Sequence, residues 1–85
     1  MKPLSYEDFA DFCETMPPEE IYEYSKSEAC ACAQWAESMG RFDEWYCKWA
    51  EGDTPWGKVD RIAEIQPWTF GALAKRLRAA ANNGK

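Results

Sequence analysis

The stretch SYEDFADFCETMPP, residues 5–18, decides the fold class of this chain. Ser5 is a good helix N-cap, and Leu4 and Phe9 are spaced as a hydrophobic staple around it. Apolar side chains at i, i+3, i+4 and i+7 form one stripe that faces a core, namely Phe9, Phe12, Cys13 and Met16. The Pro17-Pro18 pair ends the helix, because proline lacks a backbone donor and disfavours helix in the residue before it. The stretch therefore predicts an amphipathic helix.

The C-terminal part of the chain has the same kind of helix start. Thr69 is the expected N-cap, and Trp68 and Leu73 are placed as a staple. The inward stripe of this helix is Phe70, Leu73, Ala74 and Leu77. Its cations lie in the later turns, where the helix dipole favours them: Lys75, Arg76 and Arg78. We expect residues 81–85 to fray.

Between these two helices we expect further short helices. Pro18 suits the first turn of a helix that runs to Tyr24, with Ile21 and Tyr24 facing inward. A third helix is expected from Glu28 to Met39, with Ser25 or Ser27 as its N-cap and Gly40 as the left-handed residue that ends it.

The third helix begins with small side chains, residues 29–33, so it can approach its neighbours closely. We therefore place it at the centre of the protein. Its expected inward stripe is Cys32, Trp35, Ala36 and Met39.

Residues 42–50 fit two structures. The helical stripe would be Phe42, Trp45, Tyr46 and Trp49, with Asp43 as a cap and Gly52 as the end. The same aromatic residues have high strand propensity, so a short β-hairpin is the alternative. We favour the helix. Residues 51–57 are rich in turn formers and predict a loop, and Val59, Ile62 and Ala63 give one or two helical turns before the break at Gln66-Pro67.

Together these segments predict an all-α fold, one domain over residues 1–85, with about five short helices around an aromatic core. The chain has five Trp, four Tyr and four Phe in 85 residues, which is enough large apolar surface to stabilise a small core. It has no apolar run long enough to span a membrane, and its start lacks the apolar segment of a secretory signal. We expect a cytoplasmic protein whose four cysteines are reduced.

The chain contains no histidine, which removes the commonest general base and the usual partner of a nucleophilic Ser or Cys. Its five glycines are scattered and form no phosphate-binding loop, and the helical pattern places its acids in water. We therefore do not expect an enzyme.

The cysteines also argue against a structural metal. Only Cys30 and Cys32 are close in sequence, and on a helix they would point about 200° apart and could not bind one ion. We expect no metal and no cofactor, and we interpret the cysteines as small core residues. Cys30 shares a side with Gln34 and Glu37 and is the expected most reactive thiol.

The acidic N-terminal region is the most suggestive feature for function. Residues 1–65 carry fifteen acids and six bases, and residues 66–85 carry four bases and no acid. The predicted partner-binding acids on the first two helices are Glu7, Asp11, Glu14, Glu19, Glu20 and Glu23. Like charges one turn apart do not help folding, so the acids indicate a surface for a basic partner, for example as a mimic of nucleic-acid phosphate. The alternative is that they only provide solubility.

Trp56 lies between Pro55 and Gly57 and is a second candidate contact, because tryptophan is enriched at binding hot spots. Alternatively it folds back over the core. The last helix admits a nucleic-acid interpretation, in which Trp68 and Phe70 stack on bases and the cations meet phosphates. Beside an acidic body this binding would be weak and salt-sensitive, so we do not expect direct nucleic-acid binding.

Two stretches resemble short uncharacterised proteins of proteobacterial phages and prophages. One is Tyr22-Glu23-Tyr24 followed by Cys30-Ala31-Cys32-Ala33-Gln34-Trp35, and the other is TFGALAKRL, residues 69–77. The resemblance implies a mobile-element origin and no activity. Our leading hypothesis is an accessory protein that binds a host protein with a basic surface stoichiometrically, for example an anti-CRISPR-like inhibitor of a nucleic-acid-handling complex. The rivals are a nucleic-acid-associated protein that uses the basic C-terminal helix, and a structural or oligomerisation module.

Overall fold

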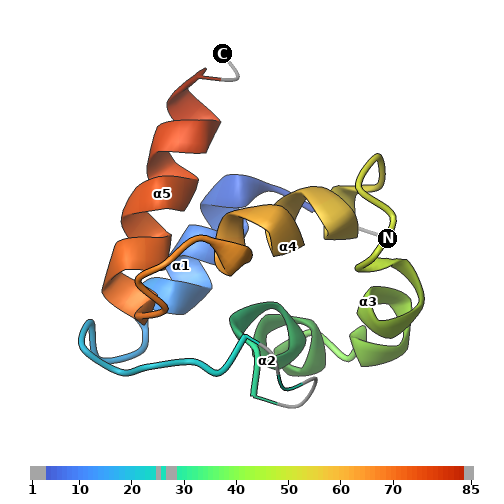
Figure 1. Ribbon diagram of the computed structural model, residues 1–85, viewed down its shortest axis with the longest axis horizontal. Helices are drawn as coiled ribbons and strands as arrows, with labels where there is room; N and C mark the ends of the chain where they lie inside the picture. The colour runs from blue at the N-terminus through green and yellow to red at the C-terminus, as the bar shows by residue number, and fades with distance from the viewer. Residues whose placement is uncertain (1–3, 25, 27–28, 84–85) are drawn as a thin grey trace.

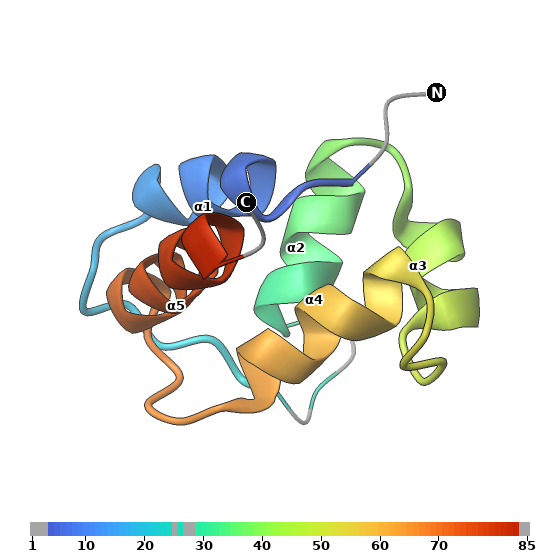
Figure 2. The same ribbon diagram turned by 90° about the horizontal axis from the view of Figure 1, so that it is seen from above.

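The computed structural model of the chain describes residues 4–24, 26 and 29–83. The helices in this part of the chain are α1 (Tyr6–Glu14), α2 (Ala31–Ser38), α3 (Phe42–Lys48), α4 (Pro55–Glu64) and α5 (Phe70–Asn83). Figure 1 shows that they form one bundle, and Figure 2 shows α1 and α5 side by side at one end and α3 at the other, with α2 and α4 between them. The predicted all-α fold of about five short helices is confirmed.

The two helices with the clearest caps form as the sequence predicts. Ser5 Oγ accepts the backbone N–H of Asp8 at 3.0 Å, and Phe9 and Cys13 face the core. Thr69 Oγ1 accepts the backbone N–H of Ala72 at 3.3 Å at the start of α5. The helix then continues through Asn83, so the expected fraying of residues 81–83 is wrong. Residues 84 and 85 lie outside the described part.

The predicted helix from Pro18 to Tyr24 is wrong. After a turn the chain is extended, and Ile21 forms an isolated antiparallel bridge with Thr69. Tyr22 is buried. Ile21, which was predicted to face inward, is 69% exposed.

The start of α5 explains this extended segment. The backbone N–H groups of Phe70 and Gly71 donate to the carbonyls of Glu20 and Pro18, both at 3.0 Å, and Tyr22 donates to the Trp68 carbonyl at 3.0 Å. These long-range hydrogen bonds use backbone groups that a local helix would otherwise need.

Helix α2 is shorter than predicted. It begins at Ala31, and Cys30 is its N-cap with extended dihedrals, φ −65° and ψ 143°. The proposed caps Ser25 and Ser27, and the proposed first residue Glu28, lie outside the described residues. Gly40 follows the helix with φ 68°, which confirms its left-handed conformation. Met39 is exposed, so its expected inward position is wrong.

Residues 42–48 are helical, so the hairpin alternative is excluded, but the helix begins after Arg41 rather than at an Asp43 cap. Of its aromatic stripe, Trp45 is buried, Phe42 is half-buried, and Tyr46 and Trp49 are exposed.

Helix α4 is longer than predicted and takes in part of the expected loop. Thr54 Oγ1 accepts the backbone N–H of Gly57 at 3.1 Å, and Pro55 occupies the first turn.

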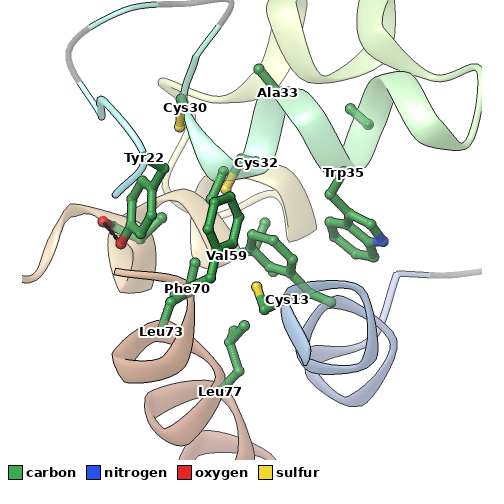
Figure 3. Packing of buried hydrophobic residues seen from close by; sticks show 14 of the residues in the cluster. Cys13, Tyr22, Cys30, Cys32, Ala33, Trp35, Val59, Phe70, Leu73 and Leu77 are labelled. Carbon is green, nitrogen blue, oxygen red and sulfur yellow. Dashed lines mark hydrogen bonds between the residues drawn. The ribbon is translucent and has the colours of Figure 1, made fainter. Parts of the chain in front are cut away.

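The core is aromatic, as predicted, and Figure 3 shows side chains of α1, α2, α4 and α5 meeting in it. The Phe9 and Trp35 rings stack with their centroids 4.5 Å apart, and Trp35 meets Trp56 edge-on at 5.5 Å. Phe70 packs against Tyr22 at 5.4 Å. None of the helices in the described part of the chain is both long and apolar enough to cross a membrane.

Candidate functional site

The acidic face of α1 is partly covered by a cation of α5. Arg78 Nη2 lies 2.7 Å from Asp11 Oδ1 and 2.7 Å from Glu14 Oε1, because α1 and α5 pack side by side (Figure 2). These two carboxylates raise the pKa of the Arg78 guanidinium. Glu7 is exposed on the same helix. Asp11 and Glu14 therefore already bind a cation of the protein itself.

The other predicted acids, Glu19, Glu20 and Glu23, are exposed on the connection between α1 and α2. Glu23 pairs with Lys26, with 3.1 Å between Oε2 and Nζ. Because the predicted second helix is absent, these acids do not continue the α1 face as a second helical face. Three of the six predicted acids therefore lie on α1, and the other three lie on the connection between α1 and α2.

Trp56 is not an exposed loop residue. It lies in α4 and is 4% exposed, so the alternative that it folds over the core is confirmed. Its Nε1–H donates to Glu44 Oε1 at 3.4 Å, and the Arg41 guanidinium lies 5.5 Å from its ring centroid. The expected surface contact at Trp56 is therefore wrong.

Three of the side chains that the nucleic-acid interpretation uses are engaged within the fold: Phe70, Arg76 and Arg78. Arg76 donates to the carbonyls of Ile62 and Pro67 and to Tyr22 Oη, at 3.3, 3.2 and 3.0 Å. Arg78 binds the α1 acids, and Phe70 is fully buried. Lys75 is the exposed cation of this helix. Base stacking by Phe70 is excluded by its burial.

An exposed aromatic surface lies on α3, which the sequence placed inward. We call Phe42 and Tyr46 of α3, together with Trp49 at its C-cap, the α3 aromatic surface; Tyr46 is 59% and Trp49 42% exposed. Tyr46 contacts Phe42 at 6.0 Å, and both Tyr46 and Trp49 pack on the buried Trp45 ring. These contacts hold the rings in place while much of their area stays in water.

A surface hollow of about 560 Å³ adjoins this surface between the end of α2 and the start of α3. It is lined by Glu37, Gly40, Phe42 and Asp43. Glu37 and Asp43 are both exposed. The aromatic surface therefore lies next to a concave region with two acidic side chains.

The interior holds a second unusual feature, which we call the thiol–carboxylate cluster: Cys30, Cys32 and Asp60. Their sulfur and carboxylate oxygen atoms all lie within 4.8 Å of one another, and all three residues are buried. Figure 3 shows both thiols at the start of α2. Tyr24 Oη donates to Asp60 Oδ2 at 2.6 Å. The cluster joins the N-terminal end of α2 to α4.

Burial and hydrogen bonds shift the acidities in this cluster. Burial raises the pKa of Asp60, and the hydrogen bond from Tyr24 opposes this shift. A hydrogen bond from Cys32 lowers the pKa of the Cys30 thiol, with help from the backbone N–H groups of Cys32 and Ala33, whereas burial raises the pKa of Cys32. The prediction that Cys30 is the most reactive thiol assumed that it shares an outer side with Gln34 and Glu37, whereas Cys30 is 1% exposed and Cys47 is the exposed cysteine.

Sequence reasoning missed this cluster for two reasons. The first is that Cys30 is extended and not helical, so the two thiols do not point about 200° apart as predicted. All acids were placed in water, yet Asp60 is 4% exposed. A signal was available, because Trp56, Val59, Asp60 and Ala63 occupy i, i+3, i+4 and i+7 of one helical stripe.

Comparisons with known proteins give no relative for this arrangement. No protein-family model, no curated protein and no solved structure matches the chain.

Proposed function

We propose that the protein acts by stoichiometric binding to a partner protein rather than by catalysis, and that the α3 aromatic surface is the centre of the contact. The observation that carries the proposal is the exposure of Tyr46 in α3 and of Trp49 at its C-cap, at 59% and 42%. Tyr and Trp are enriched among the few interface residues that supply most of the binding free energy.

The packing of these rings supports their use in binding. Both lean on the buried Trp45, so their side chains are already restrained before a partner arrives. A restrained side chain loses less conformational entropy on binding than a freely rotating one. For folding alone, burying both rings would have been more favourable than leaving them in water.

The charges next to this surface favour a partner with basic groups. The hollow beside Phe42 is flanked by Glu37 and Asp43, and the chain as a whole has a net charge of −5. A basic side chain of the partner that enters the hollow would meet both carboxylates while its neighbours cover the rings. Complementary charge of this kind mainly speeds association and selects the partner.

For the role in the cell, we propose a cytoplasmic accessory protein of a phage or prophage that inhibits a host protein. The small size, the acidic charge and the phage-like stretches support this role. A nucleic-acid-handling complex is the concrete target class, since its basic groove matches an acidic protein. The acids on α1 contribute less to this proposal than the sequence suggested, because Arg78 binds Asp11 and Glu14.

The test is quantitative affinity capture from a bacterial host lysate, with mass-spectrometric identification and then measurement of affinity for the captured protein. We expect the double variant Tyr46→Ala/Trp49→Ala to weaken binding by at least about 30-fold, as for hot-spot residues. Glu37→Lys/Asp43→Lys is expected to slow association, with a larger effect at low salt.

The matched control is Ile21→Ala, because Ile21 is also a large exposed apolar residue, at 69%, on a different segment. It is expected to leave the affinity unchanged. Equal binding by the α3 double variant and the wild type would refute the α3 surface. Loss of binding by Glu7→Lys/Glu19→Lys/Glu20→Lys alone would instead support the acidic N-terminal surface. A stable homomultimer in light scattering with no captured partner would favour the structural module.

A further inference from the structure

We propose that Cys30, Cys32 and Asp60 bind one Zn²⁺ ion, which joins the start of α2 to α4. The three ligand atoms lie within 4.8 Å of one another although Asp60 is 28 or more residues away from both cysteines in the sequence. Two thiolate ligands of a tetrahedral Zn²⁺ lie about 3.8 Å apart, so side-chain adjustments of about 1 Å bring these atoms to coordination distance. None of these three ligands belongs to the α3 aromatic surface.

The buried carboxylate of Asp60 is the first argument for a cation. Asp is almost never fully buried unless it is paired, because desolvating the charge is costly. Asp60 is 4% exposed, and no Lys or Arg of the described residues pairs with it. Its hydrogen bond from Tyr24 satisfies one oxygen but supplies no positive charge. A divalent cation at the cluster supplies that charge.

The donor set selects the kind of cation. Two sulfur atoms and one carboxylate oxygen suit Zn²⁺, which accepts both ligand types in tetrahedral sites. Ca²⁺ and Mg²⁺ require oxygen ligands, and a soft monovalent ion such as Cu⁺ would leave the carboxylate unused. Three protein ligands leave the fourth position to a water molecule.

The surroundings of the cluster fit outer partners of a metal site. Tyr24 Oη, 2.6 Å from Asp60 Oδ2, orients the carboxylate as such partners do. The Trp45 Nε1–H is buried, lies near Asp60 and has no hydrogen-bond partner among the described residues. It is available to donate to a ligand atom once the site closes around an ion.

The start of α2 prepares the first ligand. Cys30 is the N-cap of α2 with extended backbone dihedrals, so its sulfur lies near that of Cys32 rather than on another side of a helix. On a continuous helix the two thiols would diverge.

The experiment uses the full chain, reduced with a phosphine and freed of metal by a chelator. Co²⁺ is titrated as the probe, since thiolate-bound Co²⁺ gives an intense charge-transfer absorption, and Zn²⁺ is then added to displace it. We expect saturation at one Co²⁺ per chain, displacement by one Zn²⁺, and a melting temperature that rises with Zn²⁺ concentration.

Cys30→Ser, Cys32→Ser and Asp60→Asn are expected to lose the saturable absorption and the Zn²⁺-dependent rise in melting temperature. The matched controls are Cys13→Ser, a buried cysteine outside the cluster, and Cys47→Ser, an exposed one, and both should bind as the wild type does. Asp60→Asn keeps the shape of the side chain, and circular dichroism of each metal-free variant shows whether it folds.

Absence of the charge-transfer band in the folded wild type would overturn the proposal. Unchanged Co²⁺ binding by folded Asp60→Asn would also overturn it, because the carboxylate would then not be a ligand of the metal. Loss of binding in Cys47→Ser would place the metal at the surface and equally overturn it. Should Cys30→Ser and Cys32→Ser fail to fold, the wild-type titration and Asp60→Asn still decide.

Discussion

The α1–α5 pair and the α2–α3–α4 group bury their side chains in different ways. In the pair the fully buried side chains are apolar, among them Phe9, Phe70 and Leu77, and its ion pairs lie at the surface on Arg78. The group buries Asp60 and a Trp45 N–H that has no hydrogen-bond partner in the described part of the chain, and it leaves Tyr46 and Trp49 in water. Natural sequences depart from the rules of stable packing mainly at functional sites. We therefore expect the functional surfaces of this protein in the α2–α3–α4 group.

The largest effect is expected in the apolar pair. Phe70→Ala removes a fully buried ring that contacts Phe12 and Tyr22, and we expect it to lower the free energy of unfolding by about 3–5 kcal/mol. For a domain of this size that is a large share of the total stability. Urea denaturation followed by circular dichroism measures it, with exposed Ile65→Ala as the control. A loss below about 1 kcal/mol would break the comparison, because the pair would then not hold the fold together.

The second test lies in the other group. A Cβ on Gly57 would overlap the backbone carbonyl of Glu51, so Gly57→Ala must displace the turn before α4. We expect a loss of about 2 kcal/mol, since overpacking costs more than the helix propensity that Ala gains.

Gly40→Ala is the matched control for this variant. A Cβ there meets nothing within 4 Å, and only the left-handed φ of 68° opposes it, at a cost of about 1 kcal/mol. Equal losses of stability in the two variants, measured by thermal unfolding, would mean that the turn at Glu51 can move at little cost in free energy.

The third test concerns a contact that joins the two regions. Tyr22 Oη donates to the Ala63 carbonyl of α4 at 2.6 Å and accepts from Arg76 of α5 at 3.0 Å. Tyr22→Phe removes both hydrogen bonds and leaves a buried carbonyl unsatisfied, for an expected loss of about 1–2 kcal/mol. Exposed Tyr46→Phe is the control in the same urea titration and should change nothing. If Tyr22→Phe leaves the free energy of unfolding unchanged, the two regions are held together by apolar packing alone.

The smallest effect is expected at the surface of the pair. Arg78→Ala removes the ion pairs with Asp11 and Glu14, which are largely exposed and screened by solvent. We expect a slight drop in the urea midpoint, smaller than for any variant above, that disappears at high salt. Lys75→Ala on the same helix is the control. A large drop in the urea midpoint that persists at high salt would mean that these ion pairs contribute substantially to the stability of the fold.

The sequence predicted best where the signals are local. The caps Ser5 and Thr69, the left-handed Gly40 and the stripes of α1 and α5 depend on residues within two turns of one another. The segment after Pro18 was predicted wrongly because its backbone partners, Trp68, Phe70 and Gly71, are about fifty residues away. No local pattern carries that information.

The candidate sites divide in the same way. The acidity of residues 7–23 can be read directly from the sequence, but the cation that neutralises part of it comes from α5. Tyr46 and Trp49 fit a helical stripe, and only the packing of α3 through the single buried Trp45 leaves them exposed. The approach of Asp60 to Cys30 and Cys32 depends on how α4 crosses the start of α2.

By itself the sequence determined the fold class, the positions of α1 and α5 along the chain and an aromatic core, because helix caps and the 3.6-residue period act over short distances. Only the tertiary structure decided which side of α3 faces water, which acids are paired and which thiols meet a carboxylate. Those outcomes depend on contacts between segments far apart in the chain. Their free energies compete with local preference and, in this protein, outweigh it at residues 18–24 and at Cys30.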